Sequence, residues 1–241
     1  MGRKSGRAKP RAALGRFRRR LVFWLGLTAS AMVVISSAQV LFAGFVNVPF
    51  TASMLMEWFG GPEPFPWPGQ RETWRSLGNI SPDLRRAVLA GEDQRFLNHR
   101  GFDTVEMRAV LLEAAAGGGV RGASTITMQT ARTLFLTNAR SPWRKAAEAW
   151  YTVLIELMWG KGRILENYLN TVDWGPAGRG AERAGRYYFG TSADRLARGQ
   201  AAMLAAMLPN PHRWSPESTD EILLRRQRRI LNQMDRMPLV R

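Results

Sequence analysis

The chain has 241 residues, of which 45% are hydrophobic, so it can bury one well-packed core and is not a disordered polymer. It contains no cysteine, which excludes disulfides and thiolate metal sites, and its two histidines, His99 and His212, are too few for a histidine-rich zinc site. The net charge is +16, and residues 1–20 contribute nine of these charges with no acidic residue.

The first predicted element is a transmembrane helix over residues 21–46. No charged residue occurs from Leu21 to Met56, and a span needs about 20 mostly apolar residues to cross roughly 30 Å of hydrocarbon. Because Lys and Arg next to a span stay on the cytoplasmic side, residues 1–20 are predicted to be a basic cytoplasmic tail. A cleaved signal peptide is the competing interpretation, but the apolar run is longer than an ordinary signal peptide requires.

The rest of the chain is predicted to be a linker followed by one helical domain. Residues 47–80 contain the proline- and glycine-rich stretch Gly60 to Gln70 and are interpreted as a linker or arm. Ser81, followed by Pro82, and Thr104 are the predicted caps of the first two helices of the domain. We find no convincing alternating strands, so the fold class is mainly α, with the globular domain at residues 81–241. Helical patterns occur at residues 81–96, 104–116, 121–136, 143–159, 164–170, 180–190, 196–211 and 219–237.

An acidic pair, Glu92 and Asp93, follows the apolar stretch Ala87 to Ala90. The plain interpretation is a helix end with solvated acids, although the helix macrodipole disfavours acids at a C-terminal end. A carboxylate held there beside an apolar face should have a raised pKa, which suits a general base or acid near neutral pH. The spacing alone leaves both interpretations open.

Two further segments contain residues suited to binding an anionic group. Gly122 to Thr127 form a small, hydroxyl-rich start of a helix, where free N–H groups bind anions, although an ordinary helix cap is the plainer interpretation. Further along, Arg144 and Lys145 precede Glu148 by four and three residues, so the three share one helix face. A surface salt bridge is the plainer interpretation there, and neutralisation of a phosphate is the alternative.

Taken together and in this order, five motifs resemble those of the peptidoglycan glycosyltransferases, which polymerise lipid II into glycan strands. The motifs span roughly Ser81 to Pro211, and the chain is most similar to the monofunctional biosynthetic branch, since it contains no S-x-x-K motif of a transpeptidase. They are EDQRF-x-x-H-x-G-F-D, RGASTIT-x-Q-T-A-R-T-L-F-L, RKAAE, K-x-RILENYLN and GAE-x-A-x-RYYFG.

The resemblance implies a lysozyme-like helical head with a small hydrophobic jaw, Phe102 to Val120, that dips into the membrane. It implies that Glu92 is the catalytic base and Glu148 the second essential acid. Glu92 would take the proton of the acceptor 4-hydroxyl as this oxygen attacks C1 of the donor sugar, with inversion and release of undecaprenyl diphosphate. The implied substrate-binding residues are Ser124, Thr125, Thr127, Gln129, Arg132, Arg140, Arg144 and Lys145.

The resemblance also implies a location and partners. The chain would be a single-pass protein of the bacterial cytoplasmic (inner) membrane with its amino terminus in the cytoplasm and its catalytic domain outside. Its partners would be lipid II, undecaprenyl-diphosphate-linked glycan and the membrane, with other cell-wall synthesis and division proteins as candidates and no nucleic acid. No cofactor is assigned with certainty and no metal ligand is named. A divalent cation, Mg²⁺ or Mn²⁺, at the diphosphate is left open, since Glu148 would either orient the cations or hold such an ion.

Three residues depart from the family pattern. Met128 stands where the family usually has the first of two glutamines, which puts one polar substrate contact in doubt. Arg132 often corresponds to lysine, and Gln200 stands where glutamate is common and is expected to have a structural role. The alternative function is a membrane-anchored lytic transglycosylase or muramidase that cleaves glycan, which would not need a cationic site for diphosphate. A less favoured alternative is a membrane protein without enzymatic activity.

Overall fold

The computed structural model describes residues 10–48, 51–52, 54, 73–118, 122–137 and 141–240. The chain forms two compact units, Met1–Phe42 and Ala43–Arg241. Arg140, one of the predicted substrate-binding residues, lies outside the described residues.

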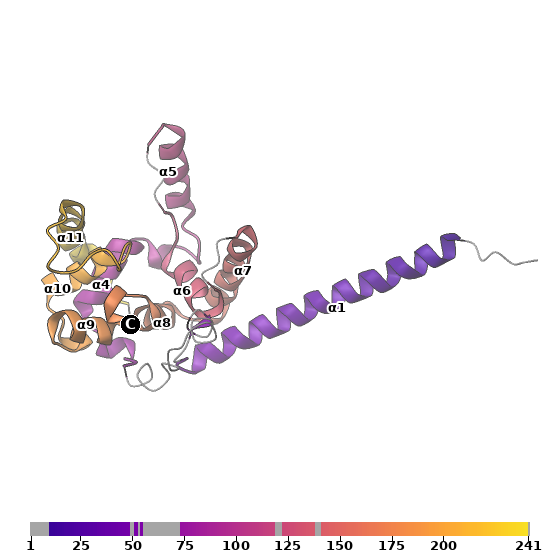
Figure 1. The fold of residues 1–241 in the computed structure, drawn as a ribbon, viewed down its shortest axis with the longest axis horizontal. Coiled ribbons are helices and arrows are strands. Elements are labelled where there is room, and N and C mark those ends of the chain that lie inside the picture. The colour runs from indigo at the N-terminus through magenta and orange to yellow at the C-terminus, as the bar shows by residue number, and fades with distance from the viewer. Residues whose placement is uncertain are drawn as a thin grey trace, which may run out of the picture. The chain divides into compact units, whose positions relative to one another are not determined.

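The first unit consists of most of one long helix, α1 (Pro10–Phe45; Figure 1). Its segment Phe17–Phe45 has 29 residues and is long and apolar enough, by length and composition, to cross a membrane. At 1.5 Å per residue this segment is about 43 Å long, which exceeds the hydrocarbon thickness of roughly 30 Å. Phe23 and Leu25 are more than half exposed, as expected of a helix whose surroundings are lipid rather than protein. The predicted apolar helix is therefore present.

The second unit is mainly helical, as predicted. Within the described ranges no strand occurs, and the bridge between Asp173 and Arg179 is isolated. Short 3₁₀ turns connect several of the helices. The helices with described bounds that follow α1 are α4 (Pro82–Glu92), α5 (Thr104–Ala115), α6 (Ile126–Phe135), α7 (Pro142–Met158), α8 (Lys161–Thr171), α9 (Ala181–Phe189), α10 (Arg198–Met207) and α11 (Glu221–Gln233).

Two groups of helices build the core of this unit. In the first, α10 packs against α4 and α11, and every residue of its stretch Ala201–Met207 is buried. The four alanines of this stretch allow the neighbouring helices to approach closely, while Leu84 and Val88 of α4 fill the space on one helix face. In the second group, α6 packs against α7 and α8. Figure 1 shows α5 projecting from the rest of the unit.

The cap of α5 differs from the prediction by one residue. Asp103, not Thr104, is the N-cap, and its carboxylate accepts the backbone N–H groups of Val105 and Glu106. Both residue types cap helices, but the charged carboxylate also interacts favourably with the positive end of the helix dipole. On α5 itself Val110 is buried, whereas Leu111 is 69% exposed.

Candidate active site

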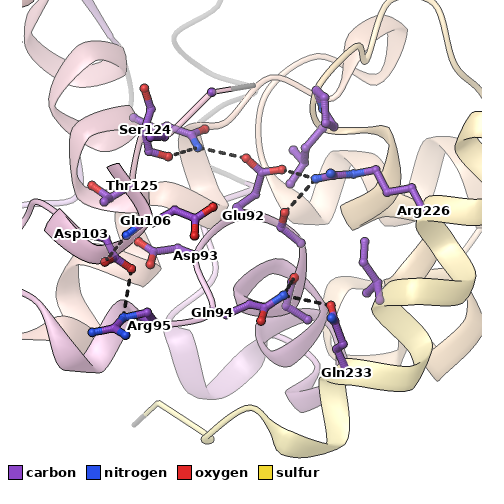
Figure 2. A pocket seen from close by; sticks show the side chains of 18 of the residues that line it. Glu92, Asp93, Gln94, Arg95, Asp103, Glu106, Ser124, Thr125, Arg226 and Gln233 are labelled. Atoms are coloured by element: carbon purple, nitrogen blue, oxygen red, sulfur yellow. Dashed lines mark hydrogen bonds and ion pairs between the residues drawn. The ribbon is translucent and has the colours of Figure 1, made fainter. Parts of the chain in front are cut away.

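A cleft of about 900 Å³ lies where the C-terminal end of α4, the start of α6 and one side of α11 meet (Figure 2). Because these helices come from both groups of the core, the relative positions of the cleft walls are set by tertiary packing. Of the residues predicted from the sequence, the cleft brings together Glu92, Ser124, Thr125, Gln129 and Arg132.

Glu92 is the last residue of α4, and its carboxylate lies between two donors in the cleft (Figure 2). Its Oε2 accepts a hydrogen bond of 3.0 Å from Nε2 of Gln129, and its Oε1 accepts one of 2.7 Å from Nη2 of Arg226. The same Nη2 donates to the carbonyl oxygen of Gly91 at 2.8 Å, so the guanidinium of Arg226 also holds the end of α4. The Glu92 side chain is 13% exposed, which leaves it accessible from the cleft.

Burial raises the pKa of Glu92, and the charge of neighbouring Asp93 acts in the same direction. The hydrogen bonds from Gln129 and Arg226 and the charge of Arg226 lower the pKa, but they do not cancel the effect of burial. The raised pKa expected from the sequence is confirmed. Its main cause is desolvation rather than the position at a helix end.

Tyr168 of α8 fixes the orientation of Gln129. Its hydroxyl donates to Oε1 of Gln129 at 3.2 Å, so the amide nitrogen of Gln129 is directed at Glu92. Tyr168 is buried, and burial together with the charge of Glu92 raises its pKa well above the usual value. The phenol therefore stays protonated and remains a donor to Gln129.

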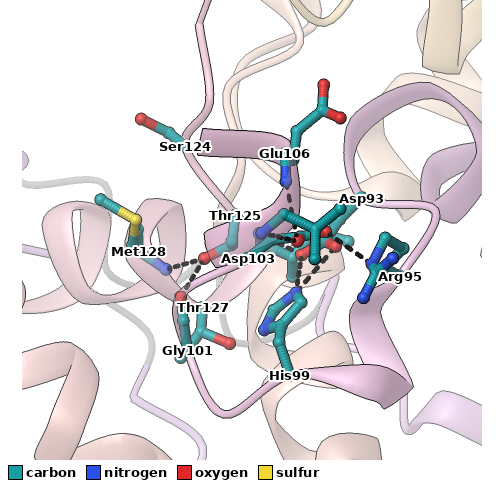
Figure 3. Close-up of polar contacts among 12 residues, drawn as sticks. Asp93, Arg95, His99, Gly101, Asp103, Glu106, Ser124, Thr125, Thr127 and Met128 are labelled. Carbon is teal, nitrogen blue, oxygen red and sulfur yellow. Dashed lines mark hydrogen bonds and ion pairs between the residues drawn. The ribbon is translucent and has the colours of Figure 1, made fainter. Parts of the chain in front are cut away.

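Asp93 has a different environment from Glu92 although the two are adjacent (Figure 3). Its side chain is almost fully buried, with Oδ1 2.9 Å from Nε2 of His99. Its Oδ2 accepts the backbone N–H of Ile126, the first residue of α6, at 3.0 Å. The anion at the start of this helix is therefore the protein's own carboxylate, contrary to the idea that the first N–H of the helix is free for substrate.

Asp93, His99 and Asp103 are three side chains with ligand atoms close enough to share a metal ion, all within 4.8 Å of one another (Figure 3). Among the described residues, however, the carboxylates of Asp93 and Asp103 and Nε2 of His99 already have partners, whereas the buried Nδ1 of His99 has none. Asp103 accepts two backbone N–H groups at the start of α5 with Oδ1, and its Oδ2 lies 3.3 Å from Nε of Arg95. This donor set fits a hydrogen-bonded scaffold under the cleft better than it fits a metal site.

Thr125 lines the cleft, but its hydroxyl is used within the protein. It donates to the carbonyl oxygen of Gly101 at 2.6 Å and accepts the N–H of Met128 at 3.2 Å, as the N-cap of α6. Gly101 has φ +86°, and a Cβ there would lie 2.6 Å from Cγ2 of Thr152 on α7. Glycine at 101 therefore lets the loop fit between the start of α6 and α7.

Glu148 lies on α7 with a fully buried side chain, and it binds both predicted cations. Its Oε2 accepts from Nη1 of Arg144 at 2.8 Å, and its Oε1 accepts from Nζ of Lys145. The predicted common face is confirmed, but these three residues are not among those that line the cleft. Because Glu148 is fully buried and each of its oxygens faces a cation, a divalent ion there would be repelled by Arg144 and Lys145, so Glu148 fits the orienting role better than the role of a metal ligand.

Thr127 is also separated from the cleft. Its buried hydroxyl donates to Oε1 of Glu156 at 2.5 Å, and the same oxygen accepts from Nζ of Lys161 at 2.8 Å. The site residue predicted at this position therefore connects α6 to α7 and to the start of α8.

Two of the residues that depart from the family pattern, Met128 and Gln200, do not line the cleft. The side chain of Met128 is 5% exposed and is not part of the cleft wall, which Gln129 provides instead. Gln200 accepts the backbone N–H of Ala197 at 2.9 Å with its Oε1, at the start of α10. This contact is the structural role that the sequence led us to expect.

Sequence reasoning missed Arg226 and Tyr168. Arg226 belongs to the arginine-rich run of α11, and it lies three residues after Leu223 and four before Ile230, both of which are buried. This helical spacing places Arg226, unlike its neighbour Arg225, on the inward side of α11. This helical periodicity could therefore have identified Arg226 as an inward-facing residue. Nothing in the sequence distinguishes Tyr168 from a core residue.

Comparison with known proteins identifies the family of this chain. The family model described as Transglycosylase matches residues 64–235. Proteins named biosynthetic peptidoglycan transglycosylase from Pseudomonas putida, Ectopseudomonas mendocina and Pseudomonas fluorescens are 46%, 44% and 42% identical to this chain over 206, 221 and 231 residues. These matches cover 84%, 90% and 94% of this chain and 86%, 87% and 91% of the relatives. The resemblance carried by the five motifs is thus confirmed, and the chain belongs to the transglycosylase family.

Proposed function

We propose that this chain is a peptidoglycan glycosyltransferase of bacterial cell-wall synthesis, which polymerises lipid II into β-1,4-linked glycan with release of undecaprenyl diphosphate. Family membership and the names of the relatives support this activity. The observation that carries the assignment is the carboxylate of Glu92, which lies in the cleft between Gln129 and Arg226 and has a raised pKa.

In the proposed reaction Glu92 is the general base. Its ionised carboxylate accepts the proton of the acceptor 4-hydroxyl while that oxygen forms the new bond to C1 of the donor sugar. The bond from C1 to the diphosphate oxygen breaks, and its electron pair leaves with the diphosphate. Because attack occurs opposite to the leaving group, the α linkage becomes β. The raised pKa of Glu92 increases its proton affinity, which favours this transfer near neutral pH.

The two donors to Glu92 position the base without blocking it. Gln129 and Arg226 each use one acceptor site on a different oxygen. A carboxylate has about four such sites, so the substrate hydroxyl can still be bound. Arg226 also favours the ionised form that the reaction requires, because an opposite charge at this distance stabilises the carboxylate.

The leaving diphosphate requires cations, which the cleft offers on two of its helices. Arg132 of α6 and Arg229 of α11 both line the cleft, and within the described ranges neither forms an ion pair. Guanidinium groups bind phosphate oxygens in a bidentate manner and stabilise the charge that develops as the bond breaks. We assign Arg144 and Lys145, held by Glu148, to the same anionic substrate outside the cleft, and no step of the reaction uses a metal ion.

We place residues 1–20 in the cytoplasm, the apolar part of α1 that follows Arg20 across the cytoplasmic membrane, and the second unit outside the cytoplasm. The nine basic residues before the apolar segment support this orientation. Both substrates have lipid tails, so an anchored enzyme searches a surface instead of a volume, which raises the effective substrate concentration. The exposed Leu111 on α5 is consistent with contact between the jaw and lipid.

The experiment that tests this function is incubation of the purified full-length protein with labelled lipid II. We expect a polymer that lysozyme degrades, and we expect Glu92→Gln to abolish its formation while lipid II binding persists. Polymerisation by that variant at the wild-type rate would show that Glu92 is not the base. Cleavage of preformed glycan without polymer formation from lipid II would instead support the lytic alternative.

A further inference from the structure

α7 has apolar side chains on two sides. Its inner side buries Leu154 and Ile155, together with the side chain of Glu148. On its outer side Trp143 is 85% exposed and Leu157 is 73% exposed. Large apolar side chains in such numbers are unusual on the water-facing side of a surface helix, and they mark a contact surface.

Five of the exposed apolar residues of α7 form one line along the helix, which we call the α7 stripe; Met158, which is 40% exposed, is not part of it. They are spaced by three or four residues, so they share one face, and the line extends over about 21 Å at 1.5 Å per residue. The α7 stripe consists of Trp143, Ala146, Trp150, Val153 and Leu157.

The C-terminal end of α7 lies beside the end of the apolar segment of α1. The last residues of α1, from Ala43 onward, belong to the second unit. A Cβ added at Gly44 would lie 2.7 Å from Nε1 of Trp159, the C-cap residue that follows α7. Nη2 of Arg163, near the start of α8, donates to the carbonyl oxygens of Ala43 and Val46 at 2.9 Å each. These contacts hold the C-terminal end of α7 next to the last residues of the apolar segment of α1.

The composition of the exposed side of α7 is suited to a bilayer surface. The exposed residues of α7 include one lysine and no acid, because Glu148 is buried and Glu156 is paired with Lys161. Tryptophan is enriched at membrane–water interfaces, where its ring lies at headgroup level.

We propose that the α7 stripe lies against the outer surface of the membrane that α1 crosses. This inference rests on the proposed function in one respect, that α1 spans a membrane. A lipid surface is favoured over a second copy of the chain because the stripe ends two residues before Trp159, which lies against the end of the anchor at Gly44. The same contact brings Arg144 and Lys145, which directly follow Trp143, to the headgroup level where lipid-linked diphosphates lie.

The test uses the absence of cysteine from the chain, which allows one label per variant. Leu157→Cys is labelled with an environment-sensitive fluorophore in the full-length protein, in nanodiscs of phosphatidylethanolamine and phosphatidylglycerol with nitroxide-labelled lipid. Val34→Cys within α1 and Arg225→Cys on α11, whose native residues are both well exposed, are the lipid and water controls. We expect lipid nitroxide to quench the label at 157 at least about twofold more than at 225, and iodide to quench it less.

Two results would overturn the inference. A label at 157 that behaves like the label at 225 would place the stripe in water, and a label that neither quencher reaches would place it against protein. Polymerisation of lipid II by the same labelled variants separates this inference from the proposed function. If the labelled protein is active but lipid nitroxide does not quench the label at 157, only the membrane contact of the α7 stripe is refuted. If lipid nitroxide does not quench the label at 34, the proposal that α1 spans the membrane is refuted.

Discussion

Replacing Arg226 with methionine removes the cation that donates to Oε1 of Glu92 and to the carbonyl of Gly91. The ionised form of Glu92 loses a stabilising charge, so its pKa, already raised by burial, should rise further. Because the base works in its ionised form, activity should then require a higher pH. We expect the acidic limb of the kcat/KM profile for lipid II polymerisation to move to higher pH, with activity partly recovered on the alkaline side.

The geometry sets the size of this shift. The two atoms are 2.7 Å apart, and the side chains of Arg226 and Glu92 are 25% and 13% exposed. With charge centres about 4 Å apart and an effective dielectric constant of about 20, the interaction is about 4 kcal/mol, an upper bound since both groups reach water. An opposite charge at this range shifts a carboxyl pKa by about 1–3 units, at about 1.4 kcal/mol each. We therefore expect the limb to move by about 1–3 pH units.

Two further variants make the measurement specific. Arg226→Lys retains a charge but not the geometry of the guanidinium, so its profile should lie between those of the wild type and the methionine variant. Arg225→Met is the matched control, because Arg225 is the adjacent residue of α11 and pairs with Glu221 at 3.0 Å. An unchanged limb in the Arg226 variant would refute the proposed coupling. An equal shift in the Arg225 variant would attribute the effect to the overall charge of α11.

Three further predictions concern the other site residues. Glu92→Gln should lower kcat by about 10²–10⁴-fold, the range for loss of a general base. Because the pKa of Glu92 is raised in the folded state, Glu92 stabilises the fold fully below its unfolded pKa, and this stabilisation is lost as pH rises through the folded pKa. Melting curves of the wild type should therefore show a fall in Tm over this pH range, and those of the variant should not. Arg144→Ala leaves the buried Glu148 with Lys145 alone and should lower the free energy of unfolding by about 1–3 kcal/mol, which corresponds to about 2–4 °C in Tm for each kcal/mol. If Arg144 contacts the diphosphate, kcat/KM should fall more than in the exposed control Arg228→Ala, and an equal or smaller loss would contradict that contact. Thr127→Val removes the hydrogen bond to Glu156 and should lower the free energy of unfolding by about 1 kcal/mol with kcat/KM within about twofold, and a large loss of kcat/KM would return Thr127 to the substrate site.

The helices could be predicted from the sequence because their signals are local. Ser141 followed by Pro142 marks the start of α7, and the Ser141 hydroxyl accepts the N–H of Arg144 as a cap should. The ion pairs of Arg144 and Lys145 with Glu148 follow from helical spacing in the same way. The one-residue difference at Asp103 arises because two adjacent residues can both cap a helix, and the charge decides between them.

The contacts around Glu92 could not be predicted in this way, because they are long-range. Gln129 lies 37 residues from Glu92 and Arg226 lies 134 residues away. The family motifs identify Glu92 and Gln129 as site residues but not the bond between them. Thr127 shows the converse error of pattern reasoning, since its hydroxyl-rich surroundings resemble those of Ser124 while its own side chain faces Glu156.

The adjacent acids Glu92 and Asp93 have different roles because α4 ends between them. Glu92 is the last helical residue, whereas Asp93 has φ −160° and ψ 77°, so the two side chains leave the backbone in different directions. Asp93 binds the N–H of Ile126, and Gln129, three residues further along α6, binds Glu92. Asp93 therefore holds the start of α6, and Gln129 of the same helix orients Glu92. Both neighbouring carboxylates thus contact α6, Asp93 through the N–H of Ile126 and Glu92 through Gln129. This arrangement gives each acid of the pair a separate physical role at the end of α4.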